Sequence, residues 1–361
     1  MRTLPTNRRV LPVWMLLIAT VVLHLGCADH GSLPPEPRFG VAADVMGREG
    51  SAWSEPVNLG PIINSPAVEN GPELSPDELS LYFNSDRSGN HDIYVSRRAC
   101  LDCPWETPVE LGPNINTPET DGTPALSGDG HLLFFTSNGH GGHGGEDLWL
   151  SRRTNTKDDF GWGPPVNLGP GANTSLNETS AAFLPGRGIN GRHTLYFVRW
   201  ATTTADFDIY QVSVSRNGEA VGPATPVTEL NLPGVLDSDP TIRADGRELM
   251  FWSGVTGGGR PGAEGGGDIW VATRCSVRDP WSAPRSIGPP VNTAHGGEFV
   301  PALSHDGRTL MFVGNMLRGG SFGRQDLWMS TRTRPFHDHD DGECNDDDRP
   351  EGIARRSPSM P

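Results

Sequence analysis

The chain has 361 residues and a net charge of −15, and it is rich in Gly (46 residues) and Pro (33 residues). Such an acidic surface disfavours nucleic acids and anionic lipids as partners, and it favours cationic ligands or basic patches on other proteins. The Gly and Pro content is typical of many short strands joined by turns.

Residues 1–27 are predicted to be an export signal, because arginines precede an apolar stretch, Val10 to Leu25, that is short for a membrane span. The stretch ends in Gly26-Cys27, which resembles a bacterial lipobox, in which the cysteine is lipidated. His24 departs from that motif, so ordinary cleavage nearby and an uncleaved anchor remain as alternatives. All three place the domain outside the cytoplasm. Ala28 after the cysteine resembles the sorting pattern for the outer membrane, so we expect a location in the periplasm or at the cell surface.

Residues 28–50 carry no repeat signature and are predicted to be a linker. Between residues 51 and 334 the same sequence pattern occurs five times. In each repeat an Asp begins the last apolar strand. The period is 55 to 61 residues, and these closing residues are Asp92, Asp147, Asp208, Asp268 and Asp326. A period slightly above the usual blade length, with about four short strands per unit, predicts an all-β, five-bladed β-propeller.

The first unit indicates how a repeat becomes a blade. Alternating apolar residues and a Pro-Asp turn predict strands at residues 72–75, 79–84, 92–97 and 105–111. The stretch from Trp53 to Leu59 has the sequence of a fourth strand with no blade before it. The last unit ends near Arg332 without a fourth strand. The N-terminal strand is therefore predicted to complete the last blade and close the ring, which removes exposed strand edges.

The remaining segments are a predicted tail and a pair of cysteines. Residues 335–361 combine dense charge with few apolar residues, which predicts a disordered acidic tail. Cys100 and Cys103 form a CxxC motif in a loop. The redox form of this motif lies at the N-terminus of a helix, and no helix is predicted here, so we expect a local disulfide, with half of a metal site as the alternative.

Three segments of the first unit resemble the PD40, or WD40-like, repeat of TolB-type propellers: Leu74-Ser75-Pro76-Asp77, Ser85-Asp86-Arg87 and Asp92-Ile93-Tyr94. The resemblance covers almost the whole repeat region, although the other units match more loosely. It implies a propeller that binds partner proteins of the cell envelope, and it is not specific for an activity. The chain departs from TolB in its five expected blades and in lacking a separate N-terminal domain, so the particular partners of TolB are not carried over.

Two further motifs have a chemical and a structural interpretation. Gly319–Gly323 matches the G-x-S-x-G motif of hydrolases, but it lies in a Gly-rich loop between two strands and not at a strand-turn-helix elbow. His140 and His143 could hold a metal, yet a Gly-rich loop does not preorganise ligands. The structural interpretation is favoured for both motifs.

An acidic residue recurs three positions before the Pro, or before Ala181 in one unit, of each innermost strand. These residues are Glu69, Asp121, Glu178, Asp237 and Glu298. If they formed a ring at one mouth of the channel, their repulsion would raise their pKa values or recruit a cation such as Ca²⁺ or an amine. The alternative is that each carboxylate caps backbone N–H groups at the entry of its own strand, and its occurrence in every repeat favours capping.

The sequence contains no catalytic triad and no nucleotide-binding loop. We therefore expect a monomeric, non-enzymatic scaffold of the cell envelope that binds a protein or a cell-wall polymer and needs no cofactor, unless the acidic positions hold a divalent cation. The alternative is a five-bladed glycosidase, because two carboxylates near the axis could perform acid–base hydrolysis.

Overall fold

The computed structural model describes residues 53–186, 192–201, 207–254 and 259–335, and the structural statements below refer to these residues. They contain twenty strands and no helix, so none of their segments is a candidate for an apolar membrane-spanning helix. The predictions for the export signal, Cys27, the linker and residues 336–361 of the acidic tail lie outside this part of the chain.

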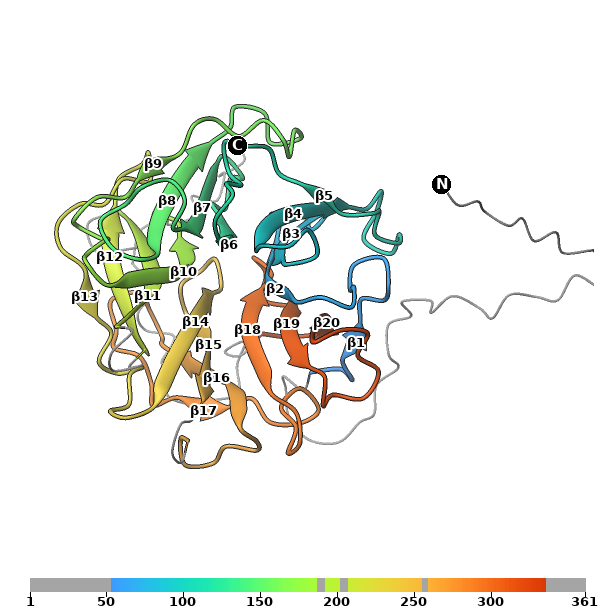
Figure 1. Ribbon diagram of the computed structural model, residues 1–361. Coiled ribbons are helices and arrows are strands. Elements are labelled where there is room, and N and C mark those ends of the chain that lie inside the picture. The colour runs from blue at the N-terminus through green and yellow to red at the C-terminus, as the bar shows by residue number, and fades with distance from the viewer. Residues whose placement is uncertain (1–52, 187–191, 202–206, 255–258, 336–361) are drawn as a thin grey trace, which may run out of the picture. The chain divides into compact units, whose positions relative to one another are not determined.

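The strands form five antiparallel sheets of four strands each, which are arranged as the blades of a propeller (Figure 1). This confirms the predicted all-β, five-bladed fold. Blade 1 contains β2 (Glu69–Leu74), β3 (Ser80–Ser85), β4 (Asp92–Arg97) and β5 (Val109–Glu110). Blade 2 contains β6 (Asp121–Leu126), β7 (Leu132–Ser137), β8 (Asp147–Arg152) and β9 (Val166–Asn167).

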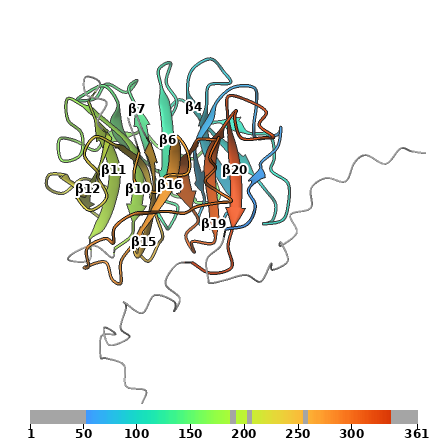
Figure 2. The same cartoon turned by 90° about the horizontal axis from the view of Figure 1, so that it is seen from below.

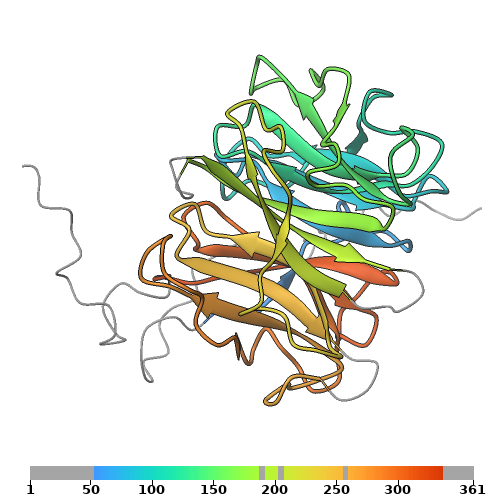
Figure 3. The same cartoon turned by 90° about the vertical axis from the view of Figure 1, so that its left-hand side faces the viewer.

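The other three blades have the same order from the axis outward. Blade 3 contains β10 (Asn177–Leu184), β11 (His193–Trp200), β12 (Phe207–Val214) and β13 (Thr225–Pro226). Blade 4 contains β14 (Leu236–Ile242), β15 (Glu248–Gly254), β16 (Gly267–Thr273) and β17 (Arg285–Ser286). Blade 5 contains β18 (Glu298–Leu303), β19 (Thr309–Asn315), β20 (Gln325–Thr331) and, as its outer strand, β1 (Val57–Asn58). Figures 2 and 3 show the blades from two further sides.

Blade 5 is completed by the N-terminal strand, as predicted. Val57 and Asn58 of β1 pair with Met329 and Trp328 of β20. The ladder is short, but side chains extend it: Asn58 Nδ2 donates to Asp326, and Asn64 bonds both the N–H and the carbonyl of Leu327. Equivalent asparagines hold the third strand of every blade, since Asn116, Asn173, Asn231 and Asn292 bond the backbone of Ile93, Leu148, Ile209 and Ile269.

The apolar core is divided into five clusters, each of which lies between two neighbouring blades. Side chains of the second and third strands fill them, and Phe83, Phe135, Phe197, Phe251 and Phe312 of the second strands are fully buried. A tryptophan from the lead-in to the outer strand seals four of the clusters; the four are Trp53, Trp105, Trp162 and Trp281. In blade 3, where Pro223 replaces the tryptophan, the turn at Gly218 packs close to Leu132, Phe134 and Leu150 instead.

Every innermost strand contains a bulge at the same place, which the sequence does not predict. The register of each innermost strand shifts by one residue against the second strand, and a residue two positions after the repeated acid has a left-handed backbone. These residues are Gly71, Thr123, Ser180, Asp239 and Val300, with φ between 44° and 57°. Left-handed φ is unfavourable for the β-branched Thr123 and Val300, at a cost of about 1–3 kcal/mol each.

Candidate functional site

The five repeated acidic residues are fully buried, each with an exposed fraction of 0%. Each carboxylate accepts a hydrogen bond from a backbone N–H four or five residues earlier, at Ser65, Thr117, Thr174, Leu232 and Thr293. In four cases the hydroxyl of that Ser or Thr donates as well. None of the five side chains lines the axial cavity described below. This geometry supports local capping of the strand entry.

An arginine completes the cap in four of the five blades. Arg87, Arg199, Arg260 and Arg318 form ion pairs with Glu69, Glu178, Asp237 and Glu298, at 2.7–2.9 Å. Each of these arginines also donates to a carbonyl of the preceding loop, such as Ile63 for Arg87 and Ala172 for Arg199. His140 has the corresponding place in blade 2, where its Nε2 lies 3.1 Å from the carbonyl of Ile115 and its ring packs on Trp149. His140 therefore has a structural role, which the sequence analysis favoured.

The capping geometry predicts that Ca²⁺ does not stabilise the protein specifically. Four of the five carboxylates already have a guanidinium partner, and the described residues contain no group of three or more Asp, Glu, His or Cys side chains that could hold a metal. We expect millimolar Ca²⁺ and Na⁺ at equal ionic strength to give the same melting temperature, measured by differential scanning calorimetry. A Ca²⁺-specific rise that Glu178→Gln abolishes would contradict the capping interpretation.

The axis of the propeller contains a cavity of about 50 Å³, lined by the five innermost strands. Its wall consists mainly of small residues and prolines, including Pro72, Pro124, Pro240 and Pro301. A cavity of this size holds one or two water molecules, whereas pockets for small organic ligands usually measure about 300–1,000 Å³.

Hydrogen bonds around the cavity join four blades in sequence. Asn84 of blade 1 accepts from the N–H of Thr123 at 3.1 Å, and the hydroxyl of Thr123 accepts from the N–H of Ser180 at 3.3 Å. The hydroxyl of Ser180 in turn donates to Asp239 at 2.6 Å. The left-handed residues thus carry this network, which is one physical reason for the strained backbone at the axis.

Two carboxyl groups line the cavity, Glu73 from β2 and Asp239 from β14. Burial raises the pKa of Glu73 to about 8, although a hydrogen bond from the N–H of Leu126 (2.9 Å) acts in the opposite direction. Burial also raises the pKa of Asp239, and hydrogen bonds from Ser180 and Ser238 partly offset this effect. Neither residue belongs to the repeated acidic set, so the repeat pattern gave no signal for them.

The raised pKa of Glu73 predicts that stability falls as the pH rises. Between about pH 4.5 and 8 the folded state keeps this proton and the unfolded state does not, so the free energy of unfolding decreases by up to about 1.4 kcal/mol per pH unit from this group. Glu73→Gln should remove this contribution, and the variant should be more stable than the wild type at pH 8. Urea denaturation at several pH values measures the difference. Equal pH dependence of both proteins would show that Glu73 is ionised in the fold.

His305 lies between the axial cavity and a second pocket of about 320 Å³, since it lines both. A Cβ atom placed on Gly128 would lie 2.8 Å from Cε1 of His305. The imidazole of His305, from blade 5, therefore reaches across the axis to the turn of blade 2 that contains Gly128. The second pocket also contains Asp129, His193 and Arg216. Burial lowers the pKa of both imidazoles, more than the nearby carboxylates raise it. This pocket has the volume of a ligand site.

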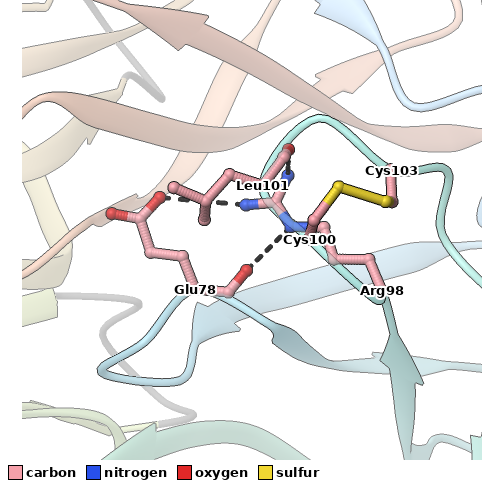
Figure 4. The surroundings of a disulfide bond; sticks show 5 residues. All are labelled: Glu78, Arg98, Cys100, Leu101 and Cys103. Carbon is pink, nitrogen blue, oxygen red and sulfur yellow. Dashed lines mark hydrogen bonds and ion pairs between the residues drawn. A yellow bond between two sulfur atoms is a disulfide. The ribbon is translucent and has the colours of Figure 1, made fainter.

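Figure 4 shows the surroundings of the two cysteines, where Arg98 lies beside the loop that carries them. Cys100 and Cys103 form a disulfide within their loop, and the carbonyl of Leu101 in that loop accepts from Arg98 Nη1 at 2.6 Å. Ser321, the serine of the G-x-S-x-G motif, lies in the loop between β19 and β20. Its hydroxyl donates a hydrogen bond to the carbonyl of Arg318 at 2.9 Å.

No protein-family model and no curated protein sequence matches the chain. Solved structures match its fold. The catalytic domain of the Coprinopsis cinerea GH62 α-L-arabinofuranosidase has a TM-score of 0.52 at 12% identity, covering 78% of this chain and 96% of that one. A thermostable family-43 glycoside hydrolase has a TM-score of 0.51 at 12% identity, covering 76% and 95%. A putative TolB from Agrobacterium tumefaciens has a TM-score of 0.45 at 16% identity, covering 79% and 93%. At these identities the two hydrolases share only the propeller fold with this chain.

Proposed function

We propose that the protein is a non-enzymatic propeller of the cell envelope that binds another protein or a cell-wall polymer. The observation that supports this proposal is the narrow axis: the cavity of about 50 Å³ between the innermost strands is too small for a sugar ring. The pocket of about 320 Å³ outside His305 offers imidazoles, Asp129 and Arg216 for recognition. We propose this end of the propeller as the binding surface.

The proposal includes a lipid anchor at Cys27 and a location in the periplasm or at the outer membrane. The arginine-rich start, the apolar stretch and Gly26-Cys27 support it. A Cys27→Ser precursor should lose metabolic labelling with fatty acid. Label that persists in this variant would rule out lipidation at this residue.

The binding function is tested with the chain from residue 28 to 361, by co-sedimentation with peptidoglycan sacculi and by capture from an envelope extract. The matched variants are Arg216→Ala in the pocket and Lys157→Ala in a loop that does not line it. We expect Arg216→Ala to weaken retention and Lys157→Ala to have no effect. Equal behaviour of both variants would place binding elsewhere on the surface.

A glycosidase remains the second candidate, because two carboxyl groups with raised pKa values, Glu73 and Asp239, face the axial cavity. A group that is protonated near neutral pH is a competent general acid. The small cavity argues against this function. Hydrolysis of arabinan or an arabinofuranoside by the wild type, and its loss in both Glu73→Gln and Asp239→Asn, would establish the enzyme and overturn the scaffold.

A further inference from the structure

An arginine stacked on a tryptophan recurs at four of the five boundaries between blades. The pairs are Arg98–Trp105, Arg153–Trp162, Arg274–Trp281 and Arg332–Trp53, with guanidinium-to-centroid distances of 4.5, 4.4, 4.0 and 4.4 Å. Stacking shields a face of the guanidinium from water, so an anion in the plane of the group stabilises it most.

Three of these arginines have a carboxylate partner, and each partner comes from a different part of its blade. Arg98 lies 3.9 Å from Glu78 in a turn, Arg153 lies 2.8 Å from Asp159 in a loop, and Arg332 lies 2.8 Å from Glu248 in β15. The recurrence of a carboxylate from unrelated positions indicates that the stacked arginine requires one.

Arg274, between blades 3 and 4, is the exception. Within the described residues no Asp or Glu oxygen lies within 4.0 Å of its guanidinium nitrogens. Its Nε donates to the carbonyl of Gly246 at 2.7 Å, and its Nη2 lies 3.5 Å from the hydroxyl of Tyr196. Nη1 makes no hydrogen bond to another described residue.

The boundary between blades 1 and 2 shows what is absent at Arg274. There, Asp159 accepts hydrogen bonds from the hydroxyls of Tyr82 (2.6 Å) and Ser80 (2.8 Å) and from Arg153 Nη1 (2.8 Å), and Arg97 donates as well. By strand register, the equivalents between blades 3 and 4 are Tyr196 for Tyr82, Thr194 for Ser80, Arg274 for Arg153 and Ser213 for Arg97. The donors that surround Asp159 are thus largely retained, but no carboxylate of the described residues pairs with Arg274.

A groove of about 590 Å³ lies where the carboxylate would be, and Thr194, Tyr196, Ser213 and Arg274 all line it. The segment from Arg274 to Trp281 is two residues shorter than that from Arg153 to Trp162, which carries Asp159. The shorter loop therefore leaves this space open to a ligand.

We propose that this groove binds the carboxylate of a small acidic ligand, which takes the position that Asp159 has between blades 1 and 2. This site is separate from the pocket beside His305 and Arg216. Glu229 and Asp279 also line the groove, beside Arg278, so repulsion disfavours a polyanion or phosphate more strongly than a ligand with one carboxylate. The carboxylate could come from an external molecule or from the acidic residues 338–348 of this chain.

The first test measures binding to the chain 28–361 by isothermal titration calorimetry, with galacturonate as the probe and galactose as its neutral counterpart. Galacturonate should bind and galactose should not. Arg274→Gln should weaken binding by about tenfold or more, and Tyr196→Phe by a few-fold, because each removes a donor to the carboxylate. Lys157→Gln, the same change of charge in a loop that does not line the groove, should have no effect.

A second variant keeps the test decisive if Arg274→Gln folds poorly. Thr194→Glu places a carboxylate where Glu248 stands in β15, so it should raise the melting temperature and abolish binding of galacturonate. The same titration is repeated after Asp338, Asp340, Asp341, Asp346, Asp347 and Asp348 are all changed to Asn and Glu343 is changed to Gln. If galacturonate binds only to this variant, the groove binds a carboxylate and the acidic tail occupies it in the wild type. Equal binding of galacturonate and galactose, or none in either background, overturns the proposal.

Discussion

Deletion of residues 51–60 is expected to lower the free energy of unfolding by at least 3–5 kcal/mol. The deletion removes Trp53, which is buried against Met250 and Phe312, and loss of a buried tryptophan alone costs about this much. It also removes Asn58 and the ladder with β20, and it leaves the edge of blade 5 unpaired. Urea denaturation followed by tryptophan fluorescence measures the loss.

A circular permutant is the matched control for this deletion. Residues 51–60 are moved to the C-terminal side of Pro335 with a short linker, which gives blade 5 the same connectivity as the other four. We expect the permutant to recover most of the lost stability, because the contacts and not the position in the chain close the ring. A deletion that unfolds at the same urea concentration as the parent would contradict ring closure by β1.

Glu248→Gln is expected to destabilise the protein by about 3–5 kcal/mol. Glu248 and Arg332 are both fully buried, and Arg332 Nη2 donates to both carboxylate oxygens at 2.8 Å. Removal of the negative charge leaves the guanidinium buried beneath Trp53 without its carboxylate, and buried pairs lose most when a single partner is removed.

Asp306→Asn provides the comparison for Glu248→Gln. Asp306 and Arg308 form an exposed ion pair with an N–O distance of 3.8 Å, and exposed pairs contribute little. The two variants are compared in the same urea titration. If both lose the same small amount of stability, the buried pair contributes no more than a surface pair.

The repeat pattern was sufficient to predict the architecture. The five closing Asp residues, the alternating strands and the unpaired stretch at Trp53 together predict the number of blades and the closure of the ring. The outer strands are shorter than expected, since residues 105–111 supply only Val109 and Glu110 to a ladder. Trp105 is buried between blades, and Asn116 bonds β4 directly, so side chains replace part of the outer ladder.

The details of the axis could not be read from the repeats. Thr123 and Val300 disfavour a left-handed backbone, so their identity argues against the bulges that the fold imposes there. At the positions of Glu73 and Asp239 the other four repeats have no acidic residue, so a comparison of the repeats does not reveal these two carboxyl groups. The Ser85-Asp86-Arg87 segment contains Arg87, the arginine that pairs with the capping carboxylate Glu69. The sequence does not predict this pair, because it forms only when the second strand lies beside the first.

The pairing of β1 with β20 also constrains when the protein can reach its final state. Asn58 and Asp326, which bond across this junction, are 268 residues apart. During synthesis the segment around Trp53 emerges first, and its neighbours in blade 5 emerge last. Blades 1 to 4 can form as their own strands appear, whereas the ring stays open until the whole repeat region is available. Closure of the ring is therefore expected to be the last step of folding, after the final strand of the repeat region has been made.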